Sequence, residues 1–200
     1  MTSLRSEVTA VVLAGGMGRR MDGVDKGLVQ VAGREMIGYV IDALAQNVEH
    51  VVVNANRNLE HYERYAVAVV PDSIEGYQGP LAGIEAGLSA ANTPWVYTCP
   101  CDSPMQSADL LPHMWSEVLA AQADIGVAHD GERTHPVFLL LRRELLTSLR
   151  AYLDDGQRKI DRWFESHRLA TIDCSQFAQS FVNVNTEEQL ADTEQFLASS

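Results

Sequence analysis

The sequence predicts a single α/β domain over residues 1–200, with three α/β/α layers and a Rossmann-like, mostly parallel sheet. Three observations indicate this fold. A chain of 200 residues suits one domain and can bury a large core without disulfides or a structural metal. Short apolar runs alternate with stretches of helical spacing, as in right-handed β-α-β crossovers. No repeat, low-complexity tract or linker interrupts this alternation.

The predicted strands are short apolar runs, several of which end at glycine or proline. They cover residues 8–13, 50–54, 66–70, 95–99, 125–129, 137–141 and 181–184. The predicted helices lie between the strands, and the final helix begins at Thr186, which forms a capping box with Gln189. The other helices cover residues 36–44, 59–65, 81–91, 110–121, 145–153 and 160–166.

The acidic composition narrows the range of partners. A net charge of −12 argues against nucleic acid and anionic membranes, because both bind basic faces. No run approaches the roughly 18 apolar residues of a membrane span, and no secretory signal is visible. Cys99, Cys101 and Cys174 match no redox or zinc spacing, so we expect packing thiols in a reducing compartment. These features predict a cytoplasmic protein with no nucleic-acid or membrane partner.

A glycine-rich segment after the first predicted strand is the strongest candidate for ligand binding. Glycines let backbone N–H groups approach an anion closely, and Arg19, Arg20 and Lys26 add local positive charge. The spacing fits neither the Walker loop nor the dinucleotide fingerprint, which excludes the usual GTPase and dehydrogenase motifs. The segment therefore predicts a phosphate site of another kind, with a plain surface loop as the alternative.

Other polar residues follow predicted strands, where open α/β sheets bind their ligands. Asp102 suits a hard cation such as Mg²⁺, although a turn or helix-cap role is the alternative. Asn54 could contact a base edge or form a turn. Asn183 and Asn185 alternate along a predicted strand and should face one side, towards either a ligand or buried backbone groups.

Several tracts together resemble one known family over nearly the whole chain. They are residues 13–16 (Leu-Ala-Gly-Gly), 19–21 (Arg-Arg-Met), 25–26 (Asp-Lys), 52–57 (Val-Val-Asn-Ala-Asn-Arg), 79–83 (Gly-Pro-Leu-Ala-Gly), 99–104 (Cys-Pro-Cys-Asp-Ser-Pro), 129–133 with 135–136, and 181–186 (Phe-Val-Asn-Val-Asn-Thr). In this order the tracts resemble the bacterial molybdenum cofactor guanylyltransferases, nucleotidyltransferases of the nucleotide-diphospho-sugar transferase type that join GMP to molybdopterin.

The resemblance implies a set of site residues and ligands. It implies GTP and molybdopterin as substrates, Mg²⁺ on Asp102, and cofactor-biosynthesis or apoenzyme-delivery proteins as partners. Arg19, Lys26 and Asp102 are the expected catalytic residues, with Arg19 and Lys26 stabilising charge on the leaving pyrophosphate. The N-terminal half would bind the nucleotide and the C-terminal half the pterin. The expected contacts are Leu13, Ala14, Gly15, Gly16, Lys26, Asn54, Asp72, Pro80, Gly83, Asp102, Asn183 and Asn185.

The sequence also departs from the family pattern and leaves rivals open. Asp22 stands where the family usually has glycine, and Glu187 where it often has proline. A cytidylyltransferase of the same fold is the nearest rival, but Gly15-Gly16 favours guanine over the Leu-Ala-Ala-Gly start of that group. A sugar-phosphate or isoprenoid-precursor nucleotidyltransferase and a non-catalytic GTP-binding module are more distant alternatives. Asp22 and Asp25 have no assigned role.

Overall fold

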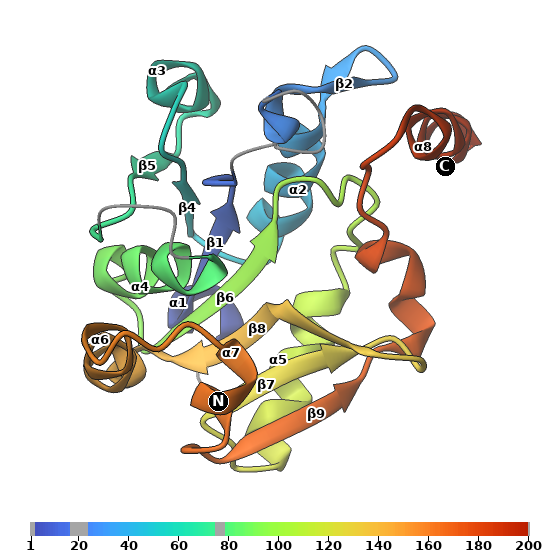
Figure 1. Ribbon diagram of the computed structural model, residues 1–200. Helices are drawn as coiled ribbons and strands as arrows, with labels where there is room; N and C mark the ends of the chain where they lie inside the picture. The colour runs from blue at the N-terminus through green and yellow to red at the C-terminus, as the bar shows by residue number, and fades with distance from the viewer. Residues whose placement is uncertain (1–2, 17–23, 75–78, 200) are drawn as a thin grey trace.

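The computed structural model describes residues 3–16, 24–74 and 79–199. These residues form a seven-stranded sheet in the order β5-β4-β1-β6-β8-β7-β9 (Figure 1). All neighbouring strands pair in parallel except β8, which runs antiparallel to both β6 and β7. The strands are β1 (Val8–Leu13), β4 (His50–Asn54), β5 (Ala68–Val70), β6 (Trp95–Pro100), β7 (Ile125–His129), β8 (Thr134–Arg142) and β9 (Leu169–Asp173).

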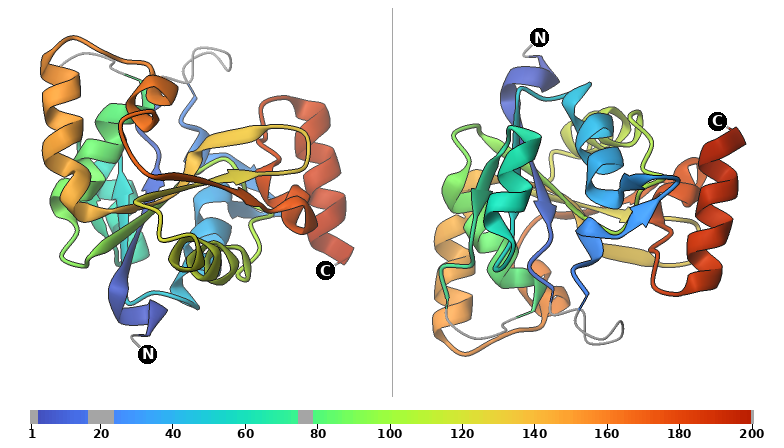
Figure 2. Two further views of the ribbon diagram at one scale, coloured as in Figure 1. Left: turned by 90° about the horizontal axis from the view of Figure 1, so that it is seen from below. Right: turned by 90° about the horizontal axis from the view of Figure 1, so that it is seen from above.

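Helices cover both faces of the sheet (Figure 2). On one face, α2 (Met36–Ala45) and α5 (Leu110–Ala120) pack against inward residues of the strands. On the other face, α4 (Pro80–Ala90), α6 (Leu146–Asp154) and α7 (Ile160–Phe164) bury a second apolar cluster. A buried sheet needs such cover on both faces because its strands are apolar on both sides. The predicted three-layer α/β fold is confirmed.

Short elements complete the described chain. They are α1 (Leu4–Glu7), η2 (Lys26–Leu28), the hairpin of β2 (Gln30–Val31) and β3 (Arg34–Glu35), α3 (Leu59–Tyr62), η3 (Glu63–Tyr65), η4 (Arg143–Leu145), η5 (Ser175–Phe181) and α8 (Glu187–Ser199). The C-terminal α8 packs on the hairpin through Leu190 and Leu197, which contact a small cluster around Val31 and Val184. None of the helices in these described ranges is long and apolar enough to cross a membrane.

In the seven-stranded sheet, one predicted strand is wrong and one strand was missed; the two-residue strands β2 and β3 were not predicted either. Residues 181–184 form no strand: Phe181 ends η5, and residues 182–184 follow without regular secondary structure. The Val184 N–H donates to the Asp102 carbonyl at 2.9 Å. The edge position beside β7 belongs to β9, which was not predicted. Only Ile172 of β9 is fully buried, so its sequence lacks the apolar run that marks the other strands.

The predicted start of the last helix agrees with the structure. Thr186 Oγ1 accepts the Gln189 N–H at 3.2 Å. The Gln189 side chain reaches back and accepts the N–H of Asn185 at 2.8 Å, one residue before the position that a strict capping box uses. These two bonds fix the direction in which the chain leaves Asn185.

We expect Gly126→Ala to destabilise the protein by about 1–3 kcal/mol, the usual effect of overpacking a core. A Cβ at Gly126 in β7 would lie 2.2 Å from Val118 Cγ2 and 2.7 Å from Ile172 Cδ1. Urea unfolding measures the change. Gly16→Ala is the control, because its Cβ meets no described atom within 4 Å. Equal stability of the two variants would contradict the tight α5–β7 packing.

Candidate functional site

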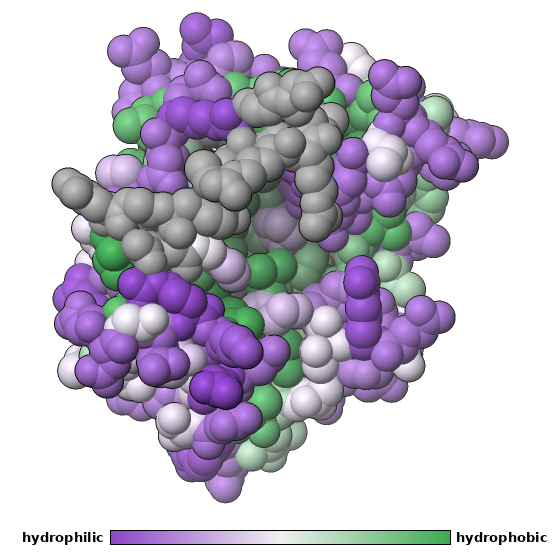
Figure 3. Space-filling model, in the orientation of Figure 1, coloured by the Kyte–Doolittle hydropathy of each residue, from purple (hydrophilic) through white to green (hydrophobic). Residues whose placement is uncertain are grey.

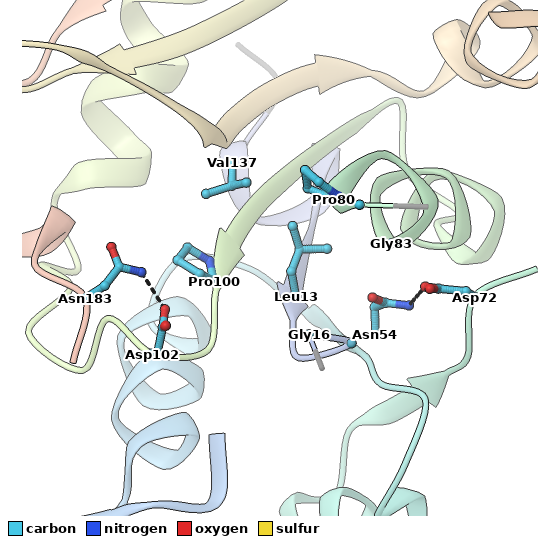
Figure 4. Close-up of a pocket in the computed structure, with 12 residues that line it drawn as sticks. Leu13, Gly16, Asn54, Asp72, Pro80, Gly83, Pro100, Asp102, Val137 and Asn183 are labelled. Carbon is cyan, nitrogen blue, oxygen red and sulfur yellow. Dashed lines mark hydrogen bonds between the residues drawn. The ribbon is translucent and has the colours of Figure 1, made fainter. Parts of the chain in front are cut away.

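A pocket of about 260 Å³ opens at the carboxyl ends of the central parallel strands (Figure 4). Leu13 at the end of β1 pairs in register with Asn54 of β4 and Pro100 of β6, so three strands end in one row. This is the edge at which open α/β sheets bind ligands. The lining residues are Leu13, Gly15, Gly16, Asn54, Asp72, Gly79, Pro80, Gly83, Pro100, Asp102, Val137 and Asn183.

The pocket has polar groups at both ends and apolar groups between them. Figure 4 shows Asn54 with Asp72 at one end, Asp102 with Asn183 at the other, and Leu13 and Pro100 between the two pairs. Hydrophobic surface is also visible in the middle of this face of the molecule, between hydrophilic rims (Figure 3). An apolar floor with a few convergent polar groups is the usual character of a small-molecule site.

A hydrogen-bonded set of side chains builds the Asn54 end. Asn54 Nδ2 donates to Asp72 Oδ1 at 2.9 Å, and Asn56 Nδ2 donates to Asp72 Oδ2 at 2.9 Å. The Asp72 N–H in turn donates to Asn56 Oδ1 at 2.8 Å. Both oxygens of Asp72 are therefore held, and the Asn54 amide nitrogen is used within the protein. The Oδ1 atom of Asn54 is directed towards the two glycines described next.

Glycine is required beside Asn54. A Cβ at Gly83 in α4 would lie 2.4 Å from Asn54 Oδ1, and a Cβ at Gly15 would lie 3.1 Å from the same atom. Gly79, just before α4, has a φ of +75°, a conformation that favours glycine. Pro80 then starts the helix at a position where proline is well tolerated. The glycines thus allow the start of α4 and the end of β1 to approach Asn54 closely.

Asp102 organises the opposite end of the pocket. It is 7% exposed, and its Oδ2 accepts from Lys26 Nζ at 2.8 Å while its Oδ1 accepts from Asn183 Nδ2 at 2.5 Å. Lys26 Nζ also donates to Asn185 Oδ1, and Asn185 Nδ2 donates to the carbonyl of Asn183 at 3.3 Å. Four side chains from three distant segments therefore meet in one cluster.

The structure brings together most of the residues expected from the sequence. Nine of them line the pocket, while Lys26 and Asn185 join it through the Asp102 cluster. Ala14 is buried beside it, and its N–H donates to the Asn54 carbonyl at 2.8 Å. Arg19, and Asp22 with it, lies outside the described residues. Asn183 and Asn185 do reach the same cluster, although no strand carries them there.

Sequence reasoning missed three lining residues and one supporting residue. Gly79 and Pro100 stand in tracts that were recognised, but Val137 comes from the antiparallel β8, which the strand-end rule does not cover. Asn56, which holds Asp72, follows Asn54 by two residues. A polar side chain two positions beyond a strand end was the available signal for Asn56.

The residues at Asp102 fit a magnesium ion bound together with a substrate. Within the described ranges, no group of three or more His, Cys, Asp or Glu side chains gathers to hold a metal. Mg²⁺ commonly takes one or two carboxylates and completes its shell with water and substrate phosphates. Asp102 supplies one carboxylate at the pocket edge, and the ammonium of Lys26 already occupies a cation position against it.

The three cysteines are packing residues, as predicted. Cys99, Cys101 and Cys174 are free and buried. Burial raises the pKa of Cys174 to about 11 and those of Cys99 and Cys101 further above the ordinary value for a thiol. These thiols therefore stay protonated near neutral pH and offer no nucleophile to the pocket.

Comparison with known proteins identifies the family. The sequence profile described as "MobA-like NTP transferase domain" matches residues 10–172. The chain belongs to this family. Two MobA-like relatives are named molybdenum cofactor guanylyltransferase. The one from Shewanella sediminis is 44% identical over 92% of this chain and 93% of its own, and the one from Shewanella frigidimarina is 43% identical over the same shares.

Solved structures share the MobA-like fold. A molybdopterin-guanine dinucleotide biosynthesis protein A from Archaeoglobus fulgidus superposes with a TM-score of 0.80 at 22% identity, covering 96% of this chain and 100% of that one. A 2-C-methyl-D-erythritol 4-phosphate cytidylyltransferase from Thermus thermophilus gives 0.72 at 16% identity, covering 96% and 99%. At these identities the likeness shows the fold alone.

We expect Gly83→Ala to weaken binding of a nucleoside triphosphate by about 10-fold, the effect of about 1.4 kcal/mol. The new methyl group would displace Asn54 and, with it, the contact to Asp72. Gly87→Ala on the same helix is the matched control, because its Cβ would meet Val11 in the core at 2.7 Å. Both variants should lose stability, and calorimetric titration should show reduced affinity for Gly83→Ala alone. Equal affinities would contradict the role assigned to this close approach.

Proposed function

We propose that the protein transfers GMP from GTP to molybdopterin, releasing pyrophosphate and forming molybdopterin guanine dinucleotide. One observation carries the proposal: relatives named molybdenum cofactor guanylyltransferase are 41–44% identical to this chain over more than nine-tenths of its length. The pocket supports it, since it combines an apolar floor with one polar end for a base and one charged end for phosphates. A non-catalytic GTP-binding module would not need Lys26 and Asp102 together at that second end.

The two ends of the pocket suggest how the substrates divide the site. The nucleotide lies against the row of Leu13 and Asn54 and against the start of α4, where Gly15, Gly16, Pro80 and Gly83 keep the space open. The pterin approaches from the side of Asn183 and Asn185. This division gives the N-terminal half to the nucleotide and the C-terminal half to the pterin, with Asp102 where the two meet.

The reaction is an in-line displacement at phosphorus. A terminal phosphate oxygen of molybdopterin attacks the α-phosphorus of GTP and forms a new P–O bond. The bond from the α-phosphorus to the bridging oxygen of the β-phosphate breaks, and pyrophosphate leaves with the electron pair. The nucleophile is already an anion, so no strong general base is required. This agrees with a pocket whose described residues include no histidine and no reactive cysteine.

The residues of the charged end reduce repulsion between the two anions. Like charges 4 Å apart repel by about 4 kcal/mol at an effective dielectric constant near 20. Lys26 supplies a positive charge close to Asp102, and we assign it to the departing pyrophosphate together with Arg19. Asp102 would hold Mg²⁺, which would supply positive charge to offset that of the phosphates. Positioning and electrostatics of this kind provide most of the rate in phosphoryl transfer.

The proposal also covers the location of the protein and its partners. A cytoplasmic protein agrees with three free thiols, because disulfides form mainly in oxidising compartments. We also propose that proteins of cofactor synthesis or apoenzyme delivery receive the product, since a pterin dinucleotide must be passed on. The net charge of −12 argues against nucleic acid and anionic membranes as partners.

The first test is pyrophosphate release with each of the four nucleoside triphosphates, with and without molybdopterin. We expect release that requires molybdopterin and magnesium and that is about 100-fold or more faster with GTP than with CTP, ATP or UTP. Faster release with CTP would make the protein a cytidylyltransferase. Binding of GTP without release would indicate a binding module.

The second test replaces the residues of the charged end. Asp102→Ala should abolish magnesium-dependent turnover, and Lys26→Ala should lower kcat by about 100-fold or more, as for other preorganised charge stabilisers. Asp109→Ala is the matched control, because Asp109 is exposed seven positions further along and makes no side-chain cap hydrogen bond. Near-normal turnover of Asp102→Ala would contradict the metal assignment. A loss of GTP affinity alone in Lys26→Ala would contradict its transition-state role.

A further inference from the structure

A buried network behind the phosphate end has no part in the proposed reaction. Asp25, next to Lys26, is 8% exposed and points away from the pocket. It contacts the segment that carries Arg57, Asn58 and Tyr62. We propose that Asp25, held by this segment, is a positioning residue that fixes the direction in which Lys26 reaches the phosphates. The inference rests on the phosphate role of Lys26 in the proposed function.

Three groups satisfy the carboxylate of Asp25. Tyr62 Oη donates to Asp25 Oδ1 at 2.5 Å, and Asn58 Nδ2 donates to Asp25 Oδ2 at 2.9 Å. The Nε atom of Arg57 lies 3.7 Å from the same Oδ2 atom. Burial and the nearby Cys101, together with the bond to Asp25, raise the pKa of Tyr62 far above its ordinary value, so its hydroxyl stays a donor.

Residues 25–27 alternate between two neighbourhoods. The side chain of Asp25 contacts Tyr62, whereas the side chain of Lys26 contacts Asp102 and Asn185. Gly27, like Asp25, lies against Tyr62: a Cβ at Gly27 would lie 2.7 Å from Tyr62 Oη. The backbone is thus held against Tyr62 on both sides of Lys26, and the lysine projects the other way.

Arg57 ties the same segment to the backbone around the phosphate end. Its Nη2 donates to the carbonyl oxygen of Val24 at 3.0 Å and to that of Gly16 at 3.4 Å. Gly16 lines the pocket and Val24 immediately precedes Asp25. Arg57 therefore links three segments: the chain that follows β1, the residue that precedes Asp25, and the segment that leads into α3.

A positioning role explains why a buried carboxylate stands so close to a site for anions. An unpaired carboxylate there would repel a triphosphate, whereas the positive charge of Arg57 offsets part of that repulsion and the two hydrogen bonds hold the carboxylate in place. Lysine has a long side chain with much rotamer freedom, so a fixed backbone is what limits its reach. A displacement of about 1 Å in a catalytic group can lower the rate by about 100-fold.

The test uses Tyr62→Phe, which removes one donor to Asp25 and keeps the buried ring. Asn58→Gly is a second variant: it removes the other donor, and glycine accepts the φ of +53° found there. Tyr65→Phe is the matched control, because Tyr65 Oη donates to a carboxylate of Glu35 at 2.6 Å away from the pocket. We expect Tyr62→Phe and Asn58→Gly each to lower kcat by about 10-fold, and Tyr65→Phe to leave it unchanged.

A double-mutant cycle separates positioning from general destabilisation. In a Lys26→Met background, Tyr62→Phe should change kcat by less than about 2-fold, because the residue through which it acts is gone. An equal loss in both backgrounds, or no loss in the Lys26 background, would overturn the inference. Thermal unfolding of each variant checks that Tyr62→Phe and Tyr65→Phe lose similar stability.

Binding measurements distinguish failure of this inference from failure of the proposed reaction. If the wild-type protein releases no pyrophosphate, the proposed function fails, and the affinities for GTP and guanosine then decide the inference. A weaker affinity of Tyr62→Phe for GTP with an unchanged affinity for guanosine would support it, because only GTP carries the phosphates that Lys26 contacts. Equal changes for both ligands, or none for GTP, would overturn it.

Discussion

The ion pair between Lys26 and Asp102 is the contact on which the rest of the site depends. It joins residues 76 positions apart, and through Asn185 it extends to a residue 159 positions from Lys26. The side chains are only 23% and 10% exposed, so removing either charge would leave its partner poorly solvated. The segment that carries Asn183 and Asn185 has no place in the sheet. The side-chain cluster, a backbone bond from the Val184 N–H to the Asp102 carbonyl, and the packing of Val184 against Val31 and Met36 together hold this segment in place.

Close backbone approach is the second constraint, and it acts at the opposite end. Gly83 and Gly15 leave room for the amide oxygen of Asn54, while Asp72 holds its nitrogen. Gly27, next to Lys26, likewise leaves room for the hydroxyl group of Tyr62. The shape of the pocket and of its support therefore depends on Gly15, Gly27 and Gly83 as much as on the polar side chains themselves. A phosphate site needs such approach, because backbone N–H groups contact anions only where side chains do not intervene.

The sequence predicts the central strands well because their burial on both faces produces continuous apolar runs, whereas the mostly exposed edge strand β9 has no such run. β1, β4 and β7 have the predicted limits, and their ends place Leu13 and Asn54 correctly. The misplaced strand at 181–184 has a physical reason: the same apolar-polar alternation also suits extended chain that packs on a loop. The Lys26–Asp102 pair was not foreseen either, since spacing along the chain does not reveal which charges meet. Asp25 stayed without a role for the same reason, because its partner Tyr62 stands 37 positions away.

The Lys26–Asp102 contact holds the charged end of the pocket together, because it joins the segments that carry Lys26, Asp102 and Asn185. A double-mutant cycle with Lys26→Met and Asp102→Asn, read as free energies of unfolding in urea without ligand, tests it most directly. We expect a favourable coupling energy of about 1–3 kcal/mol, as found for residues in contact. Additive effects within about 0.5 kcal/mol would contradict it, because independent residues behave in that way.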